Sequence, residues 1–304
     1  MKKSIKFLAW TIACLLFWSP SALAQAVSWC SDTAVVDQQA VTDQQAVLMD
    51  LARARVVYLG ETHDAIADHQ GQLQIIQALY QRDQRMAIAL EMFQRPYQPF
   101  LDQYLAGEIT ELELQKQSEY DSRWGFPWEY YAPILRFAKA HQLPLIALNV
   151  PTEITRKVAR EGLESLTLSD RQWIPPDSEI RTDNAVAYRQ MIQAVYEEIH
   201  QGRSASSSFD RFFLAQVLWD ETMAEGIANF SQAKPNHQVI VLAGEGHLVY
   251  GYGIPSRVAR RVAGIIQRSV IINPDEGMEV EGVISSTNPQ GITDYFWLSD
   301  SCRS

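Results

Sequence analysis

The sequence predicts an α/β fold in which a mostly parallel central sheet, with a mixed edge, is covered by helices on both faces. Two observations predict this class. Short apolar runs alternate along the chain with amphipathic helical patterns. The runs are continuously apolar, which is typical of strands that are buried on both faces of a sheet. No linker marks a domain boundary, so residues 25–304 are expected to form a single domain.

The first half of the chain is expected to contribute three strands. Each is a short apolar run that is set apart by polar residues or by a helical pattern. In order, the predicted elements are a strand at 55–59, a helix with Leu73, Ile76, Leu79 and Tyr80 on one face, a strand at 86–90, short helices at 96–105 and 111–119, a helix at 131–141 and a strand at 143–148.

The second half is expected to complete the sheet and to supply the longer helices. Pro151 is suited to the start of a helix, because proline fits the first helical position. In order, the predicted elements are helices at 152–162, 186–200 and 209–230, a strand at 237–243, a helix at 256–266, a strand at 269–272 and an edge strand at 294–298.

Residues 1–24 have the pattern of a secretory signal peptide. Three lysines precede an apolar run over 7–18, and residues 21–24 offer an Ala-x-Ala cleavage site. The run is short for the alternative, a retained membrane anchor. We therefore expect an exported protein that is periplasmic or associated with the outer membrane.

The expected export determines how the cysteines are interpreted. Cys14 lies within the apolar run, and Thr11 stands where a lipoprotein usually has leucine, so a lipoprotein is disfavoured. Removal of the signal would leave Cys30 and Cys302, near the two ends of the chain. In an oxidising compartment two such cysteines are expected to form a disulfide, the alternative being two unrelated thiols.

Polar side chains follow three of the predicted strands directly. Glu61 and His63 follow the first, Glu91 follows the second, and Glu245 and His247 follow the strand at 237–243. The pattern Gly-x-x-His thus occurs twice after a strand, whereas 15 glycines and 6 histidines predict only ~0.3 matches by chance. Parallel strands end at one edge of a sheet, where ligands bind. His63, Glu91 and His247 are therefore expected to converge within about 10 Å.

These residue types suit two kinds of chemistry. Imidazole supplies a metal ligand or a base near neutral pH, and carboxylates bind metals, orient imidazoles or accept protons. One hypothesis is a metal site of His63, Glu91, Glu245 and His247. In a hydrolase, His63, Glu91 and His247 would be catalytic, with Glu61 or Glu245 as acid or base. The alternative is that the two histidines only cap turns.

Several common functions are disfavoured. The net charge of −10, from 26 Lys and Arg against 36 Asp and Glu, argues against a nucleic-acid binder. The chain has no Gly-x-Ser-x-Gly elbow, no phosphate-binding P-loop, no Cys-x-x-Cys-His and no His-Glu-x-x-His. Conventional serine hydrolases, P-loop nucleotide enzymes, covalent haem proteins and zincins are therefore not indicated.

The motifs resemble those of the ChaN-like haem-binding uptake proteins, over roughly residues 50–275. The segments that carry the resemblance are 57–63, 89–93, 124–131, 148–151, 215–220 and 244–247. That family is grouped with the Tiki and TraB proteins and the erythromycin esterases, some of which are metal-dependent peptidases or esterases. The resemblance implies a ChaN- or erythromycin-esterase-like α/β fold. It also implies haem binding at a dimer interface, with a tyrosine on the iron and His and Lys near the propionates.

Several residues are candidates for a haem site. Tyr250 and Tyr252 lie just beyond His247, and tyrosinate is a known axial haem ligand. Glu61 and His63 would lie at the same edge of the sheet. Arg257 would meet a propionate, or else lie on an exposed helix face.

Two further features have open interpretations. The aromatic stretch 119–131 would wall a haem pocket, or pack as a long cover loop. His69 would face the site from the next helix or lie in solvent. The other histidines, at positions 141, 200 and 237, are expected to be structural.

The sequence thus predicts an exported haem-binding protein in haem or iron uptake, with haem bound non-covalently and a homodimer around it. The acidic composition would require a local basic rim for the propionates. The alternative is a metal-dependent peptidase or esterase with a divalent metal ion. A membrane receptor or transporter as partner stays open.

Overall fold

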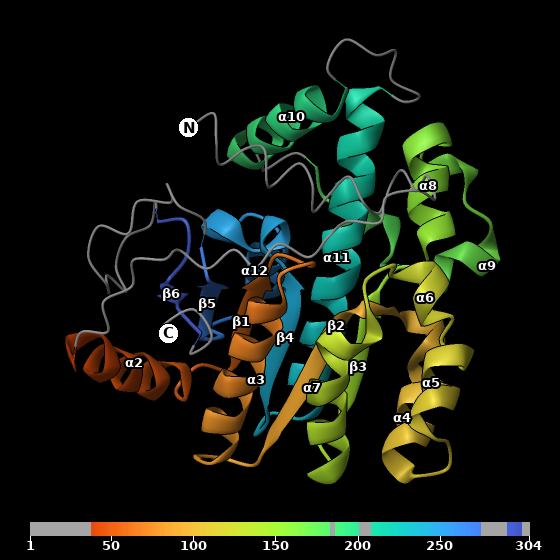
Figure 1. Ribbon diagram of the computed structural model, residues 1–304. Coiled ribbons are helices and arrows are strands. Elements are labelled where there is room, and N and C mark those ends of the chain that lie inside the picture. Colours follow the sequence, from red (N-terminus) through yellow and green to blue (C-terminus); the bar gives the residue numbers. More distant parts are fainter. Residues whose placement is uncertain (1–37, 183–185, 201–207, 275–290, 300–304) are drawn as a thin grey trace.

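Six parallel strands form one sheet in the order β3-β2-β4-β1-β5-β6 (Figure 1). The computed structural model describes residues 38–182, 186–200, 208–274 and 291–299. The strands are β1 Val56–Glu61, β2 Met86–Gln94, β3 Leu145–Asn149, β4 Gln238–Gly244, β5 Gln267–Ile272 and β6 Tyr295–Trp297. Every residue of β1 and β2 is buried. The predicted α/β class is confirmed.

The edge of the sheet differs from the prediction. β6 pairs with β5 in parallel, with Val270 opposite Tyr295, so the described sheet has no antiparallel edge. A parallel neighbour needs a connection of a dozen or more residues instead of a tight hairpin. Residues 273–294 between the two strands are long enough for that connection.

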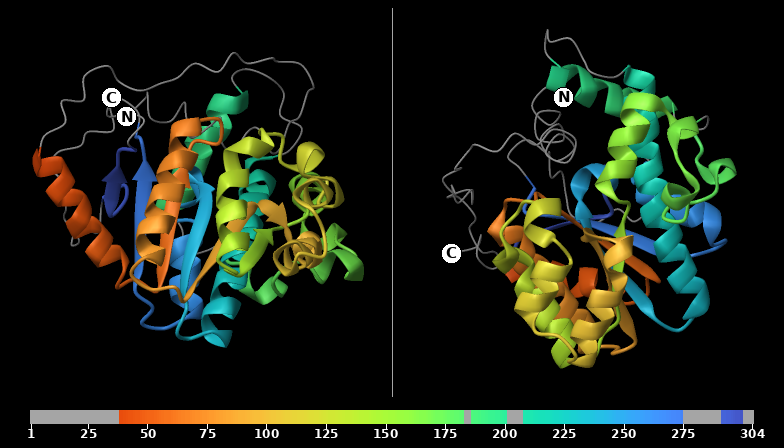
Figure 2. Two further views of the ribbon diagram at one scale, coloured as in Figure 1. Left: turned by 60° about the horizontal axis from the view of Figure 1, so that its bottom comes forward. Right: turned by 90° about the vertical axis from the view of Figure 1, so that its right-hand side faces the viewer.

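Helices cover both faces of the sheet (Figure 2). On one face lie α3, Ile66–Tyr80, and α7, Trp128–Ala140. On the other lie α11, Phe209–Ala233, and α12, Ile254–Arg261. This two-sided cover explains why the strand sequences are continuously apolar.

The remaining described helices surround this core. They are α2 Gln38–Leu51, α4 Gln98–Ala106, α5 Glu111–Gln117, α6 Tyr120–Arg123, α8 Thr152–Glu161, α9 Leu168–Arg171 and α10 Val186–His200. α5 begins where Thr110 and Glu113 exchange hydrogen bonds in a capping box. None of the described helices is long and apolar enough to cross a membrane. The expected signal peptide at 1–24 and the expected Cys30–Cys302 disulfide lie outside the described residues.

Candidate functional site

The strand order brings the predicted polar residues to one edge of the sheet. β4 lies between β1 and β2, and Glu61 at the end of β1 is in register with Gly244 at the end of β4. The chain leaves β1 toward α3 and leaves β4 toward α12, on opposite faces of the sheet (Figure 2). Such a divergence of loops opens the crevice in which α/β proteins bind ligands.

Glu61 organises the β1 side of the site. Its carboxylate contacts Nδ1 of His63 at 2.8 Å and accepts hydrogen bonds from Gln72 Nε2 at 2.5 Å and from the Tyr131 hydroxyl. His69 Nδ1 lies 3.6 Å from Glu61, and its Nε2 contacts the backbone oxygen of His63 at 3.1 Å. His69 is therefore a buried part of the site and not a solvated residue.

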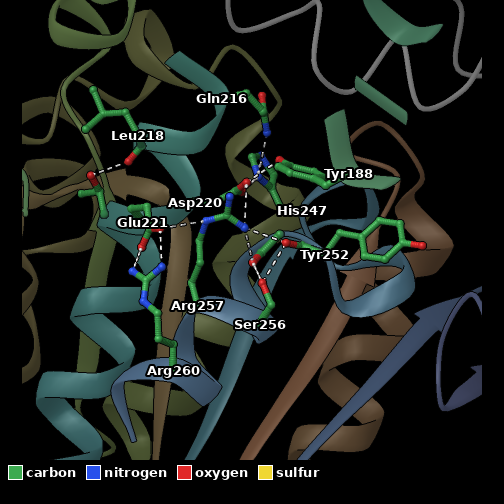
Figure 3. A network of polar contacts seen from close by, with 12 residues as sticks. Tyr188, Gln216, Leu218, Asp220, Glu221, His247, Tyr252, Ser256, Arg257 and Arg260 are labelled. Carbon is green, nitrogen blue, oxygen red and sulfur yellow. Dashed lines mark hydrogen bonds and ion pairs between the residues drawn. The ribbon is translucent and has the colours of Figure 1, made fainter. Parts of the chain in front are cut away.

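Asp220 organises the β4 side of the site (Figure 3). Its Oδ1 lies 2.6 Å from Nδ1 of His247, and its Oδ2 accepts a hydrogen bond from the Tyr188 hydroxyl. Nε2 of His247 lies 3.4 Å from Oε1 of Glu91. Oε2 of Glu91 accepts a hydrogen bond of 2.7 Å from the backbone N–H of Gly244.

A bulge in β2 holds Glu91 in this place. The pairing of β2 with β3 shifts register between Leu90 and Gln94. Asn149 Nδ2, at the end of β3, donates a hydrogen bond of 2.8 Å to the backbone oxygen of Glu91. Bulges of this kind redirect a side chain next to a site.

His63, Glu91 and His247, here called the histidine centre, converge as the sequence predicted. A methyl group on Gly244 would lie 2.9 Å from Nε2 of His63 and 3.8 Å from Oε2 of Glu91. The three side chains belong to residues that are 2%, 0% and 3% exposed. Glycine at position 244 is what lets the imidazole of His63 lie against the end of β4.

The surrounding charges set the protonation of the site. Burial alone would lower the pKa of His247, but Glu91 and Asp220 raise it to about 10. Burial likewise acts against protonated His63, yet the Glu61 hydrogen bond and the Glu91 charge raise the pKa of His63. Burial raises the pKa of Glu61, but the charges and hydrogen bonds of His69, His63 and Tyr131 outweigh it and lower that pKa to about 2.

Aromatic residues enclose both imidazoles. Trp124 lies edge-on to His63 with ring centroids 4.7 Å apart, and Phe126 contacts the same ring at 5.1 Å. Trp219 lies edge-on to His247 at 4.8 Å. The aromatic stretch 119–131 therefore packs against the buried imidazole of His63.

The residues expected near haem occupy different environments. Tyr250 is 43% exposed and stacks on Tyr252, with ring centroids 5.3 Å apart and planes at 24°. Its φ of 57° is left-handed, which is rare for a bulky residue. Arg257, by contrast, is buried and not on an exposed helix face. Its Nε lies 3.4 Å from Glu221.

The predicted metal ligands do not form a recognisable metal cluster. Within the described ranges, no three or more His, Cys, Asp or Glu side chains gather in a way that could hold a metal ion. Glu245 is buried, and its charge and that of Glu61 add to burial in raising the pKa of Asp68.

Sequence reasoning did not identify Asp220 or Tyr188 as site residues, and it included Tyr131 only as part of the aromatic stretch 119–131. One signal was available for Asp220. Gln216 interrupts the otherwise apolar run at 212–219, Asp220 follows one helical turn later, and both are buried. Polar residues so placed on a buried helix face need partners, which here include His247.

The chain is similar to known proteins in sequence and in fold. A family model described as "Haem-binding uptake, Tiki superfamily, ChaN" matches residues 47–258. A solved structure described as "Cofacial heme binding to ChaN of Campylobacter jejuni" has a TM-score of 0.63 at 19% identity, covering 83% of this chain and 90% of that one. A mutant of erythromycin esterase EreC in its open conformation has a TM-score of 0.44 at 16% identity, covering 76% of this chain and 72% of that chain.

One curated relative comes from a plant. The chain is 25% identical over 269 residues to the Arabidopsis thaliana protein RETICULATA-RELATED 5, chloroplastic. The match covers 84% of this chain but 36% of that protein, so the chain spans about a third of the length of this relative.

Proposed function

Because the chain belongs to the ChaN family of haem-binding uptake proteins in the Tiki superfamily, we propose that it binds haem on the surface beside the histidine centre, with Tyr250 as the iron ligand. The observation that carries this proposal is the exposed Tyr250 in a left-handed backbone conformation, three residues after His247. Rare backbone conformations are concentrated at functional sites. Because Tyr250 is 43% exposed, a ligand can reach it from outside.

The buried histidine centre favours a surface site for haem. His63, Glu91 and His247 are each at most 3% exposed, and Trp124 and Trp219 pack against the two rings. A tetrapyrrole requires a large apolar contact area with few polar groups. The stacked rings of Tyr250 and Tyr252 supply part of that area, and a bound iron would supply a Lewis-acidic centre for the phenol oxygen.

A hemin titration tests the proposal. We expect a Soret band when hemin is mixed with the purified protein, and its loss or shift in Tyr250→Phe. Tyr252→Phe tests whether the neighbouring phenol is the ligand instead. Tyr80→Phe is the matched control, because Tyr80 lies at the far end of α3 and packs against Phe137 and His141. A native spectrum in Tyr250→Phe would contradict the ligand assignment, and no Soret band in any variant would contradict haem binding.

A second candidate function is hydrolysis by acid–base chemistry at the histidine centre. The observation that favours it is the pair of buried imidazoles, each held at Nδ1 by a carboxylate and each near Glu91. Such pairs are suited to proton transfer. Turnover of a library of esters and peptides, measured with and without a chelator, tests for the activity and for a metal. His63→Ala should abolish it, whereas His141→Ala should not.

Together with haem binding, we propose that the protein is exported and acts in haem or iron uptake. We propose that residues 1–24 direct export to the periplasm or outer membrane and are then removed. Mass spectrometry of the N-terminus of exported material tests this, and a retained Met1 would contradict it.

We also propose a homodimer around haem. Light scattering should show twice the monomer mass when hemin is present, and an unchanged mass would contradict the dimer.

A further inference from the structure

A groove lies at the end of the sheet opposite the histidine centre, where the strands begin. Its walls are the connections that lead into β1, β2 and β5 and the end of α11, which leads into β4, and its volume is about 570 Å³. Binding sites for small molecules commonly measure about 300–1,000 Å³. In the described chain, none of its lining residues belongs to the histidine centre or to the proposed haem site.

Basic side chains gather in this groove. In the part of the chain that the structure describes, its lining holds one carboxylate, Asp83, and four arginines, Arg53, Arg55, Arg82 and Arg85. The whole chain, by contrast, has a net charge of −10. Guanidinium groups that are concentrated in a hollow focus a positive potential there, which attracts anions.

Two exposed arginines of the groove have no carboxylate partner. Among the described residues, the side chain of Arg53 forms no hydrogen bond and no ion pair. Arg82 donates to neutral oxygens, the backbone oxygen of Ala78 at 3.0 Å and Oε1 of Gln45 at 3.2 Å. Arg136, on the outer surface of α7, pairs with two glutamates instead. The fold thus supplies carboxylates to other exposed arginines but leaves these two available to an anion.

Arg55 is a half-buried cation in the wall of the groove. Its Nη2 is held by the backbone oxygens of Ser231 and Lys234, whereas its Nε and Nη1 form no hydrogen bond within the described residues. Burial lowers the pKa of Arg55, and no carboxylate of the described chain lies against its guanidinium to oppose that effect. A charge that is partly removed from water is costly unless it is paired. An anion in the groove would supply the missing partner.

Arg85 shows how the groove can hold an anion. Its Nε and Nη2 donate parallel hydrogen bonds of 3.0 and 2.7 Å to the two carboxylate oxygens of Asp83. Guanidinium groups bind carboxylates and phosphates in this two-point manner. The groove also has an apolar part, because Ile265 and Ile266 line it and Ile266 is 52% exposed. A matching ligand therefore combines anionic groups with an apolar body.

We propose that this groove binds a small molecule that carries carboxylate or phosphate groups on an apolar body. Arg53, Arg55 and Arg85 bind the anionic groups, and the two isoleucines contact the apolar body. The site lies at the opposite end of the sheet from the histidine centre and does not depend on the function proposed above.

Titration of the full chain with two fluorescent probes tests the proposal. Naphthalene-2,6-dicarboxylate and 2-naphthyl phosphate share an apolar ring system and differ in their anionic groups. We expect saturable binding of at least one probe, and the tighter of the two identifies the class of anionic group. The uncharged dimethyl ester of the dicarboxylate should bind at least tenfold more weakly than the better probe. No saturable binding of either probe, or equal binding of the ester, would overturn the proposal.

Single variants locate the bound probe. Arg53→Gln and Arg85→Gln should each weaken binding about tenfold, because a hydrogen bond to a charged group contributes at least that much. Arg156→Gln is the matched control, since it removes the same charge from an exposed position on α8, beyond the far end of β3. Tyr250→Phe should bind the probe like the native chain, which separates this groove from the proposed haem site. Native affinity in both groove variants, or equal weakening in Arg156→Gln, would refute the site.

Discussion

At the scale of single residues, Gly244 leaves no room for a side chain beside His63. The backbone of Gly244 has φ −56° and ψ 139°, which any residue adopts, so the need for glycine is one of space. A Cβ there would lie 2.9 Å from Nε2 and Cε1 of His63. Packing that is too tight costs about 1–3 kcal/mol.

Gly244→Ala is therefore expected to lower the free energy of unfolding by about 1–3 kcal/mol, because the imidazole of His63 must move. Urea unfolding followed by circular dichroism measures the change. Gly226→Ala on α11 is the control, because its Cβ would meet the flexible end of Leu148 at 3.1 Å and Nη2 of Arg95 at an ordinary contact distance of 3.6 Å. Equal effects of the two substitutions would show that His63 does not occupy this space.

The protonation of His247 predicts a pH dependence of stability. The pKa of His247 is raised in the folded chain to about 10, from an ordinary value of 6.5, by Glu91 and Asp220 against the effect of burial. The folded state therefore binds this proton more tightly than the unfolded chain does, and the resulting stability is complete below pH 6.5. It is lost as the pH rises toward 10.

Urea unfolding between pH 6 and 10 should show this loss. In His247→Gln the decline across that range should be weaker, because the neutral amide has no proton to lose. A decline of the same slope in both proteins would mean that other groups cause it. His141→Gln is the control for the loss of an imidazole, because His141 follows the C-terminal end of α7, away from the site.

At the scale of elements, the strands were predictable and much of the site was not. Continuous apolar runs identified β1, β4 and β5 to within two residues, because burial on both faces leaves an unmistakable pattern. α2 was missed, since its sequence is rich in glutamine and has no clear apolar stripe. The convergence of His63, Glu91 and His247 followed from strand topology, whereas Asp220 reaches the site only through the packing of α11.

Arg257 is a second residue whose environment the sequence did not predict. Its position on α12 resembled that of an exposed cation, but Glu221 on α11 makes it an interior residue. A partner 36 positions away in the sequence leaves no local signal. Sequence patterns therefore locate site residues that directly follow a predicted strand. They do not locate residues that reach the site through the packing of a neighbouring helix.

Arg55, at the end of the sheet opposite the site, illustrates how a helix and a strand are held together. Arg55 Nη2, just before β1, donates hydrogen bonds of 2.9 and 2.6 Å to the backbone oxygens of Ser231 and Lys234. These carbonyls end α11, where a cation also complements the helix dipole. Arg55 thus ties the end of α11 to the start of β1.

Arg55→Met is expected to lower the free energy of unfolding by about 1–2 kcal/mol, through loss of these hydrogen bonds. Thermal or urea unfolding measures it. Arg85→Met is the matched control at the same edge. The side chain of Arg85 is 63% exposed and pairs with Asp83, so its loss should have no measurable effect. If Arg85→Met destabilises the protein as much as Arg55→Met, the cause is the basic charge of this edge and not capping.

At the scale of the whole molecule, the beginning and the end of the described chain lie together. Gln44 on α2 donates a hydrogen bond of 3.2 Å to the backbone oxygen of Leu298. Asp50 at the end of the same helix accepts from the Tyr295 hydroxyl at 2.7 Å. Figure 2 shows α2 on the β6 side of the sheet. These contacts close the chain into a loop of nearly its full length.

This closure supports the last prediction, a disulfide between Cys30 and Cys302, which lie 14 residues before Gln44 and four residues after Leu298. The two Cα atoms must approach within about 7 Å. A bridge around so long a loop would stabilise the fold by up to about 4–5 kcal/mol in the chain-entropy model. Peptide mass spectrometry of unreduced exported protein should recover the two cysteines linked. The double variant Cys30→Ser with Cys302→Ser should unfold at lower urea, to the same midpoint as the reduced native chain. Free thiols in exported material would refute the bridge, since an oxidising compartment links any two cysteines that the fold holds in contact.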